Sequence, residues 1–241
     1  VRNSTLGDRG MQIDKISFND ISVFHQEEEF SIFHKLNFTR TVGGKDWLRK
    51  FFTEPHSDIK KILGTQRIIR TLIAHLEEWP EEITNGTIIM MDRFLDYPVD
   101  TIPQNPNAFS SFSYRLLHTE DYSMIKFSVK HFADFYRGLK KLSKQFENID
   151  LPDYFKLYID RISQLLKEEP LKKLADTSPR EKFTAAQNLY FGYYLRGRYK
   201  TDSLELINIF SRLDAWFSMA VAVKTFKLTF PEFIESDDPV I

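Results

Sequence analysis

Residues 38–72, FTRTVGGKDWLRKFFTEPHSDIKKILGTQRIIRTL, contain a glycine pair followed by a lysine, as a phosphate-binding loop would. A P-loop, however, needs four residues between its two glycines and then Lys-Ser or Lys-Thr, so that amides cradle the phosphates and a hydroxyl reaches Mg²⁺. Here Gly43 and Gly44 are adjacent, and Asp46 follows Lys45. This spacing excludes a P-loop and favours a helix start, where glycine lets a neighbouring backbone approach and Lys45 is solvated or paired with an acid.

The second half of this stretch has the periodicity of an amphipathic helix. Ser57 and Asp58 supply an N-terminal cap and a favourable charge for the first turn. Apolar residues then recur at intervals of three, four and seven, at Ile59, Ile62, Ile69, Ile73 and Leu76. We therefore expect a helix over residues 57–79.

A longer segment, residues 122–147, predicts a helix with one apolar face and one basic face. At about 100° per residue, one side carries Ile125, Val129, Phe132, Phe135, Tyr136, Leu139, Leu142 and Phe146. The opposite side carries Lys126, Lys130, Arg137, Lys140, Lys141 and Lys144. Such a basic face could follow a phosphate backbone, although an ordinary solvated helix face is also rich in lysine.

Helical patterns extend over most of the chain, which has only 9 glycines and 10 prolines. Further helices are expected at 22–36, 44–53, 81–95, 154–167, 180–195 and 203–226. The three prolines within 97–107 break any helix and predict a crossover at the end of a bundle. The sequence has no internal repeat and no run of strand-like segments, so the predicted fold is all-α, an elongated bundle of long amphipathic helices.

Composition excludes several classes of function. The 33 basic and 34 acidic residues nearly cancel, so a polyanion would have to bind through local patches. Without cysteine the chain has no thiolate nucleophile, disulfide or Cys-based metal site, which fits a cytoplasmic protein. The longest apolar stretch, residues 215–223, is far shorter than the ~20 residues that cross a bilayer, so no membrane partner is expected. Residues 1–10 lack the apolar centre of a signal peptide and are expected to form a flexible leader.

Metal and hydrolase chemistry are not favoured by the sequence. His25 falls on one helical face with Glu28 and Glu29, and His131 has Asp134 one turn later. The paired Glu-x-x-His elements of a di-iron bundle do not occur, and no Gly-x-Ser-x-Gly marks a serine nucleophile. We expect a solvated surface at both places, no metal site and no catalytic residue.

Two groups of motif residues, one near each end of the chain, stand in a recognisable order. The first comprises Thr41, Gly43, Gly44, Lys45, Leu48, Pro55, Asp58, Gln66 and Arg67, and the second comprises Asp214, Ser218, Ala220, Phe230 and Pro231. Together they resemble the core, or lever, domain of MutS-type DNA mismatch-repair ATPases. In that family a Thr-x-x-Gly-x-Arg-x-Leu helix start, a Pro-x-x-Asp turn and an Ile-x-x-Arg-Gln helix are followed, far later, by a returning helix with an Asp-x-x-x-Ser-x-Ala pattern. Lys45 in place of the common arginine, and the inverted order Gln66-Arg67, indicate a divergent branch.

The resemblance implies that residues 11–236 form a helical core or lever and that this chain is not itself an enzyme. It also implies an ATPase domain, absent from this chain, that binds ATP and Mg²⁺, forms a homodimer and follows a linker starting at 237–241. Because the core pattern begins near residue 20, no mismatch-reading domain is expected, and residues 171–202 leave room for at most a short clamp remnant. The implied partner is mismatched or branched DNA, in repair or recombination.

Residues 188–200, NLYFGYYLRGRYK, interleave aromatic and basic side chains. Aromatic rings can stack on bases while guanidinium groups neutralise phosphates. The predicted nucleic-acid contacts are therefore Tyr194, Arg196, Arg198 and Lys200, together with Lys130, Arg137, Lys141 and Lys144 of the basic face. The structural alternative is that the tyrosines pack in the bundle and that Arg196-Gly197-Arg198 forms a turn between helices.

Two further functions stay open on the sequence alone. A stand-alone helical scaffold would bind a protein through an apolar or aromatic face and would bind DNA no more strongly than charge allows. An RNA- or single-strand-binding module would use Tyr194 and Arg196 for tight, salt-sensitive binding.

Overall fold

A computed structural model describes residues 22–25, 27–99 and 101–233, and within these ranges the chain forms helices and no strand. The predicted all-α class is therefore confirmed. The elements are η1 (Glu28–Phe30), α2 (Ile32–Leu36), α3 (Val42–Thr53), α4 (Ile59–Ile73), η2 (Leu76–Glu78), α5 (Asn85–Asp96), α6 (Ala108–Leu117), α7 (Thr119–Gln145), α8 (Asp153–Leu165), α9 (Leu171–Ala175), α10 (Ala185–Arg196) and α11 (Lys200–Phe226). The predicted leader 1–10 and the predicted linker 237–241 lie outside the described residues.

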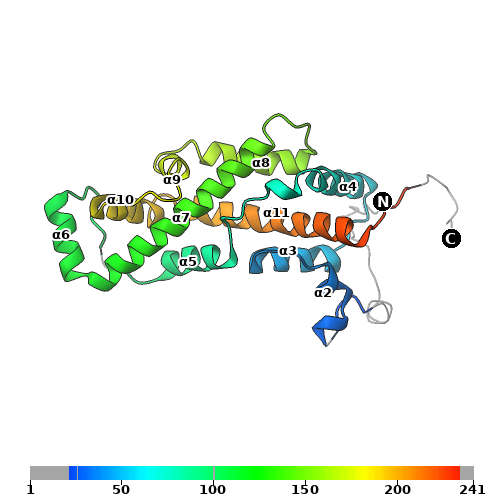
Figure 1. Cartoon of the computed structure of the whole chain (residues 1–241), viewed down its shortest axis with the longest axis horizontal. Coiled ribbons are helices and arrows are strands. Elements are labelled where there is room, and N and C mark those ends of the chain that lie inside the picture. Colours follow the sequence, from blue (N-terminus) through cyan, green and yellow to red (C-terminus); the bar gives the residue numbers. More distant parts are fainter. Residues whose placement is uncertain (1–21, 26, 100, 234–241) are drawn as a thin grey trace, which may run out of the picture.

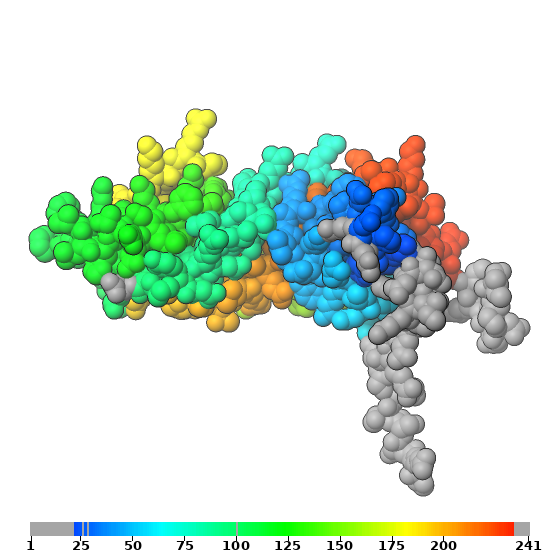
Figure 2. All heavy atoms as spheres, turned by 90° about the horizontal axis from the view of Figure 1, so that it is seen from below, coloured from blue at the N-terminus to red at the C-terminus, as the bar shows by residue number. Residues whose placement is uncertain are grey.

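The helices form an elongated bundle around two long members, α7 and α11 (Figure 1), each of 27 residues. Helices α2, α3 and α4 surround one half of α11, while α5, α6 and α10 lie against α7 toward the opposite end. The surface shows the same division, with the N-terminal helices over one half and α5 to α7 over the other (Figure 2). At 1.5 Å per residue, each long helix spans about 40 Å.

Helix α11 is long and apolar enough to cross a bilayer, but 67% of its apolar window is buried inside the described chain. The central helix of a bundle is typically apolar and buried in the same way, so the apolar sequence of α11 is only weak support for a membrane span.

Three of the differences from the expected helices have a local reason. The helix expected over 57–79 ends at Ile73, and the chain leaves helical geometry at Trp79, which precedes a proline that disfavours the helical region. The helix expected over 22–36 is confined to α2, because Ser31 caps a new helix after the chain has folded back onto Ser22. Helix α6 was not expected; Asn107 and Ser110 cap it directly after the proline-rich crossover.

The start of α3 is fixed to the middle of α11 by a buried carboxylate. Asp214, fully buried on α11, accepts the backbone N–H of Arg40 at 3.0 Å, the backbone N–H of Thr41 at 2.9 Å and the Thr41 hydroxyl at 2.8 Å. The Thr41 hydroxyl oxygen in turn accepts the N–H of Gly44 and caps α3. One side chain thus joins segments more than 170 residues apart.

The two glycines of the opening stretch allow this contact. A Cβ atom at Gly44 would lie 2.1 Å from Oδ2 of Asp214, and one at Gly43 would lie 2.4 Å from Oγ of Ser211. Both distances are far shorter than a van der Waals contact. The glycine pair therefore allows close helix packing, as the spacing predicted. In the same contact, Thr41, Gly43 and Gly44 of the first group of motif residues touch Asp214 of the second group.

Aromatic rings fill the space between the long helices and their neighbours. Trp79 stacks on Phe217 of α11 at 4.4 Å, and Nε1 of Trp47 on α3 donates to Asn208 of α11 at 3.0 Å. Trp216 packs against Phe51 of α3 at 5.9 Å. All three tryptophans of the chain therefore lie on or against α11.

Replacing Gly44 with alanine is expected to lower the free energy of unfolding by about 2–3 kcal/mol, because the new methyl group collides with Asp214. Gly64 is the matched control: it lies inside α4, and a Cβ atom there meets nothing within 4 Å. Gly64→Ala should instead raise the free energy of unfolding by about 0.5–1 kcal/mol. Urea denaturation of both variants measures the two effects, and equal values would contradict the proposed close approach.

Stability is also expected to depend on pH through Asp214. Burial raises the pKa of this carboxyl above its ordinary value of 3.8, although hydrogen bonds from Arg40 and Thr41 oppose the shift. Because the pKa of Asp214 is higher in the folded than in the unfolded state, protonation of Asp214 stabilises the fold. This contribution to the free energy of unfolding is lost as the pH rises from 3.8 through the pKa of the folded state.

The Asp214→Asn variant lacks that titration. Between about pH 7 and about pH 4, the unfolding free energy of the wild type should therefore rise relative to that of the variant. The measurement is urea denaturation of both proteins at each pH. A difference between the two proteins that stays constant across this range would contradict the assignment.

Candidate nucleic-acid interface

Two of the predicted contact residues, Arg196 and Lys200, bind the end of α5. Nη1 of Arg196 donates to the carbonyl oxygens of Phe94 and Tyr97, each at 2.5 Å, and Nζ of Lys200 donates to that of Leu95 at 2.9 Å. The last carbonyls of a helix have no partner within the helix, and cationic donors also complement its dipole. Both cations therefore stabilise the C-terminal end of α5.

The tyrosines around them pack mainly against one another. Tyr194 contacts Tyr190 at 4.8 Å and Tyr193 at 5.3 Å between ring centroids, and all three are partly buried. Tyr199 is buried, and its hydroxyl donates to the carbonyl of Glu169. Among the predicted contacts of this segment, Arg198 is the exposed one, 3.9 Å from the Glu168 carboxylate.

The basic face of α7 is interrupted in its middle. Arg137 donates to the Asp134 carboxylate and, at 3.2 Å, to the Thr177 hydroxyl, while Lys140 pairs with Asp176. Asp176 and Thr177 belong to the segment after α9, which packs against α7. The cations that stay exposed are Lys126, Lys130, Lys141 and Lys144, and within the described residues none of them forms an ion pair or hydrogen bond.

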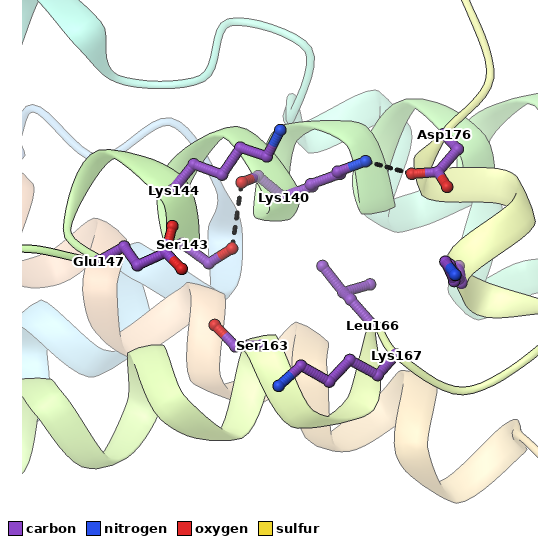
Figure 3. Close-up of a pocket in the computed structure, with 9 residues that line it drawn as sticks. Lys140, Ser143, Lys144, Glu147, Ser163, Leu166, Lys167 and Asp176 are labelled. Atoms are coloured by element: carbon purple, nitrogen blue, oxygen red, sulfur yellow. Dashed lines mark hydrogen bonds and ion pairs between the residues drawn. The ribbon is translucent and has the colours of Figure 1, made fainter.

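A basic pocket of about 280 Å³ lies at one end of this basic face, between α7, α8 and α9 (Figure 3). Lys140 reaches across it to Asp176, and Lys144 and Lys167 extend from opposite walls. The lining residues are Lys140, Ser143, Lys144, Glu147, Ser163, Leu166, Lys167, Lys172 and Asp176. Four lysines thus face two carboxylates, which leaves the pocket with a net positive charge.

A second pocket, of about 580 Å³, lies at the other end of the same face. It is formed by α7, the loop before α10 and the first turns of α10. Its lining residues are Lys126, Lys130, Pro179, Arg180, Glu181, Lys182, Phe183 and Asn188. Four cations face one carboxylate, so this pocket is also basic.

Sequence reasoning identified the α7 lysines of both pockets and missed the other lining residues. Lys167 comes from the turn after α8, Lys172 from α9, and Arg180 and Lys182 from a loop. Their lysines and arginine are scattered in sequence, and a single chain carries no signal that a loop will fold back over a helix 50 residues earlier. The packing of α8, α9 and α10 against α7 brings them together.

The remaining motif residues have structural places. Leu48 is fully buried beside Phe33 and Ala215, and Asp58 caps α4 through a 2.7 Å bond from the N–H of Lys60. Pro55 lies in the turn between α3 and α4. Arg67 pairs with Asp150 at the surface, and Nε2 of Gln66 donates to the carbonyl of Pro231 at 3.0 Å. The Gln66 contact is a second junction between the two groups of motif residues.

Comparison of the chain with protein-family models, with curated proteins and with solved structures found no match. Within the described residues, no three histidine or acidic side chains converge as a metal site would require.

Replacing Arg196 with methionine is expected to cost about 1–3 kcal/mol of unfolding free energy, because the carbonyls of Phe94 and Tyr97 lose their donor while the aliphatic stem is retained. Arg198→Met is the matched control. It removes the same charge from an exposed site, so its cost should stay below about 0.5 kcal/mol. Urea denaturation compares them, and a cost for Arg196→Met as small as that of the control would leave Arg196 free for a ligand.

Proposed function

We propose that this chain is the helical core and lever segment of a MutS-related DNA repair or recombination ATPase. Its task is to couple an ATPase domain, which is not part of this chain, to DNA binding. The observation that carries the proposal is the meeting of the two groups of motif residues at Asp214. Thr41 donates to its carboxylate, and Gly43 and Gly44 allow the approach of the two helices. Residues chosen from the resemblance alone therefore form one packed junction.

The mechanical part of the proposal follows from α7 and α11. Each helix satisfies its backbone hydrogen bonds internally and can move as a rigid body over its length of about 40 Å. Tyr136 of α7 is fully buried and bonded at 2.8 Å to Ser203 of α11, whose hydroxyl donates to the carbonyl of Tyr199. Movement of α11 would therefore carry α7 with it.

The DNA-binding part follows from the exposed cations of α7. Lys126 and Lys144 are 18 residues apart, or about 27 Å along the helix, and lie on the same face. Phosphates of a duplex backbone could be neutralised along this length, and such contacts carry affinity rather than sequence specificity. The intramolecular bonds of Arg137, Arg196 and Lys200 make these three weaker candidates.

A protein-binding scaffold is the second candidate, because α6 presents an apolar face to solvent. Phe109 is 80% exposed, Leu117 75%, Leu116 68% and Phe112 65%. A contiguous face of this kind is typical of a protein-interaction surface. An RNA- or single-strand-binding module is less well supported, since Arg196 and most of the tyrosine rings are engaged within the fold.

Reversing the charge of Lys130, Lys141 and Lys144 to glutamate is expected to weaken duplex binding and to flatten its salt dependence. For three lost phosphate contacts, the slope of log K against log salt should fall by about two to three. Fluorescence anisotropy with labelled duplex and branched DNA, over a series of salt concentrations, gives both quantities.

The control is the triple reversal of Lys35, Lys60 and Lys224, which are exposed on other helices and change the net charge equally. It should leave the slope near that of the wild type. Equal losses in the two triple variants would mean that DNA binding reflects overall charge alone, and the scaffold would then be the better proposal.

A further inference from the structure

Helix α6 turns an apolar face to solvent at one end of the bundle. The helix lies across the end that is opposite to α2 and α4 (Figure 1). Its inner side, where Tyr114 is buried, packs against α7 and α10. Among the described residues, the four most exposed large apolar side chains all belong to this one helix of 10 residues: Phe109, Phe112, Leu116 and Leu117.

Three of these side chains form a stripe with the spacing of a helix–helix seam. Phe109, Phe112 and Leu116 recur after three and then four residues, and we call them the α6 stripe. At about 100° per residue they fall within about 60° of one another, on the side opposite Tyr114. A narrow stripe of this spacing is the one that packs into a facing helix in a coiled coil. The partner that the α6 stripe fits is therefore another helix.

The charges around the α6 stripe favour a second copy of the same chain. Arg115 is the only charged residue of α6, and its guanidinium lies over the ring of Tyr122 on α7 of the same chain, 5.9 Å from the centroid. A surface without charge can meet its own copy without like-charge repulsion. A partner selected by complementary charge would find no group on the α6 stripe with which to pair.

The exposed apolar area is sufficient for a weak dimer. The four side chains together expose on the order of 500 Å² of apolar surface, which is in the upper part of the range for the largest patch on a monomer. Two copies that cover this surface mutually would bury about 1,000 Å², the lower limit for a specific interface. The area therefore fits a dimer that dissociates at low concentration.

We propose that the α6 stripe is the interface of a two-fold symmetric dimer of this chain, in which two α6 helices pack antiparallel. The middle of the stripe lies beside Phe112, so the two copies of Phe112 meet near the two-fold axis. Phe109 of one copy then packs beside Leu116 of the other. The antiparallel arrangement also places the two helix dipoles favourably. Because α6 lies at the end of the bundle, the two bundles are joined end to end.

Sedimentation velocity of the full chain between about 1 and about 300 µM tests the dimer. The chain should change from monomer to dimer over this range, with a Kd on the order of 10 µM. Small-angle X-ray scattering at the high concentration should give a maximum dimension nearly twice that of the monomer. A monomer at every concentration would overturn the proposal and leave the α6 face to a different protein. A dimer hardly longer than the monomer would overturn it too.

A single substitution locates the interface. Phe112→Arg should raise the Kd of the dimer by about tenfold or more, because it brings two cations together near the axis. Leu157→Arg is the matched control, since Leu157 lies on α8 and is nearly as exposed as Phe112. It should change the Kd less than about twofold. Circular dichroism verifies that both variants are folded, and equal weakening by the two would reject α6 as the interface.

A mixture of two variants tests the two-fold symmetry. Position 112 meets its own copy in this arrangement, so Phe112→Arg and Phe112→Glu should each stay monomeric alone. An equimolar mixture should dimerise again, because arginine then faces glutamate. A mixture that stays monomeric where the wild type is dimeric would contradict the symmetric contact. The proposal does not rest on the lever function, and none of these measurements involves DNA, so the two can fail separately.

Discussion

The fold depends on a buried carboxylate that replaces water for the backbone of a distant segment. Asp214 carries a group that is costly to bury, and the N–H groups of Arg40 and Thr41 would otherwise be left at the start of α3 without partners. The two N–H groups offset part of the desolvation cost of the carboxylate, and the carboxylate gives both N–H groups an acceptor. These hydrogen bonds form only if the backbones of α3 and α11 approach closely, which explains the glycines at positions 43 and 44. Together with the packing of Leu48 on Ala215 and of Phe51 on Trp216, this junction places α2 to α4 against α11.

The second organising element is α7, which serves the core on one side and carries cations on the other. Its apolar side is almost completely buried, while the segment after α9 crosses its basic side. There Asp176 pairs with Lys140 and the Thr177 hydroxyl accepts from Arg137, which itself pairs with Asp134 of α7. The crossing divides one continuous row of positive charge into two separate basic hollows. A helix face that would have offered only diffuse attraction to polyanions thereby gains places with defined shape and volume.

The sequence predicted the parts of this structure that depend on local periodicity. The helices expected at 122–147 and 203–226 match α7 and α11 to within three residues at each end, because burial along one face repeats at the helical period. Helix α6 was not predicted because it directly follows the proline-rich segment, although its exposed apolar side chains lie on one face. Arg196 and Lys200 had the right composition for a nucleic-acid contact, but their partners are carbonyls about 100 residues away that carry no side-chain signature.

The distribution of aromatic residues has a spectroscopic consequence. The three tryptophans lie on or against α11 and the N-terminal helices, whereas the tyrosines of α10 gather toward the opposite end. Indole emission therefore reports on the half of the molecule that contains the Asp214 junction and is nearly silent about the half that contains α6 and α10. The tyrosines are spread more widely, since Tyr158 packs against Trp216. A melting curve recorded by indole emission, compared with one recorded by far-ultraviolet circular dichroism, would therefore reveal whether the tryptophan-bearing half unfolds together with the rest of the bundle.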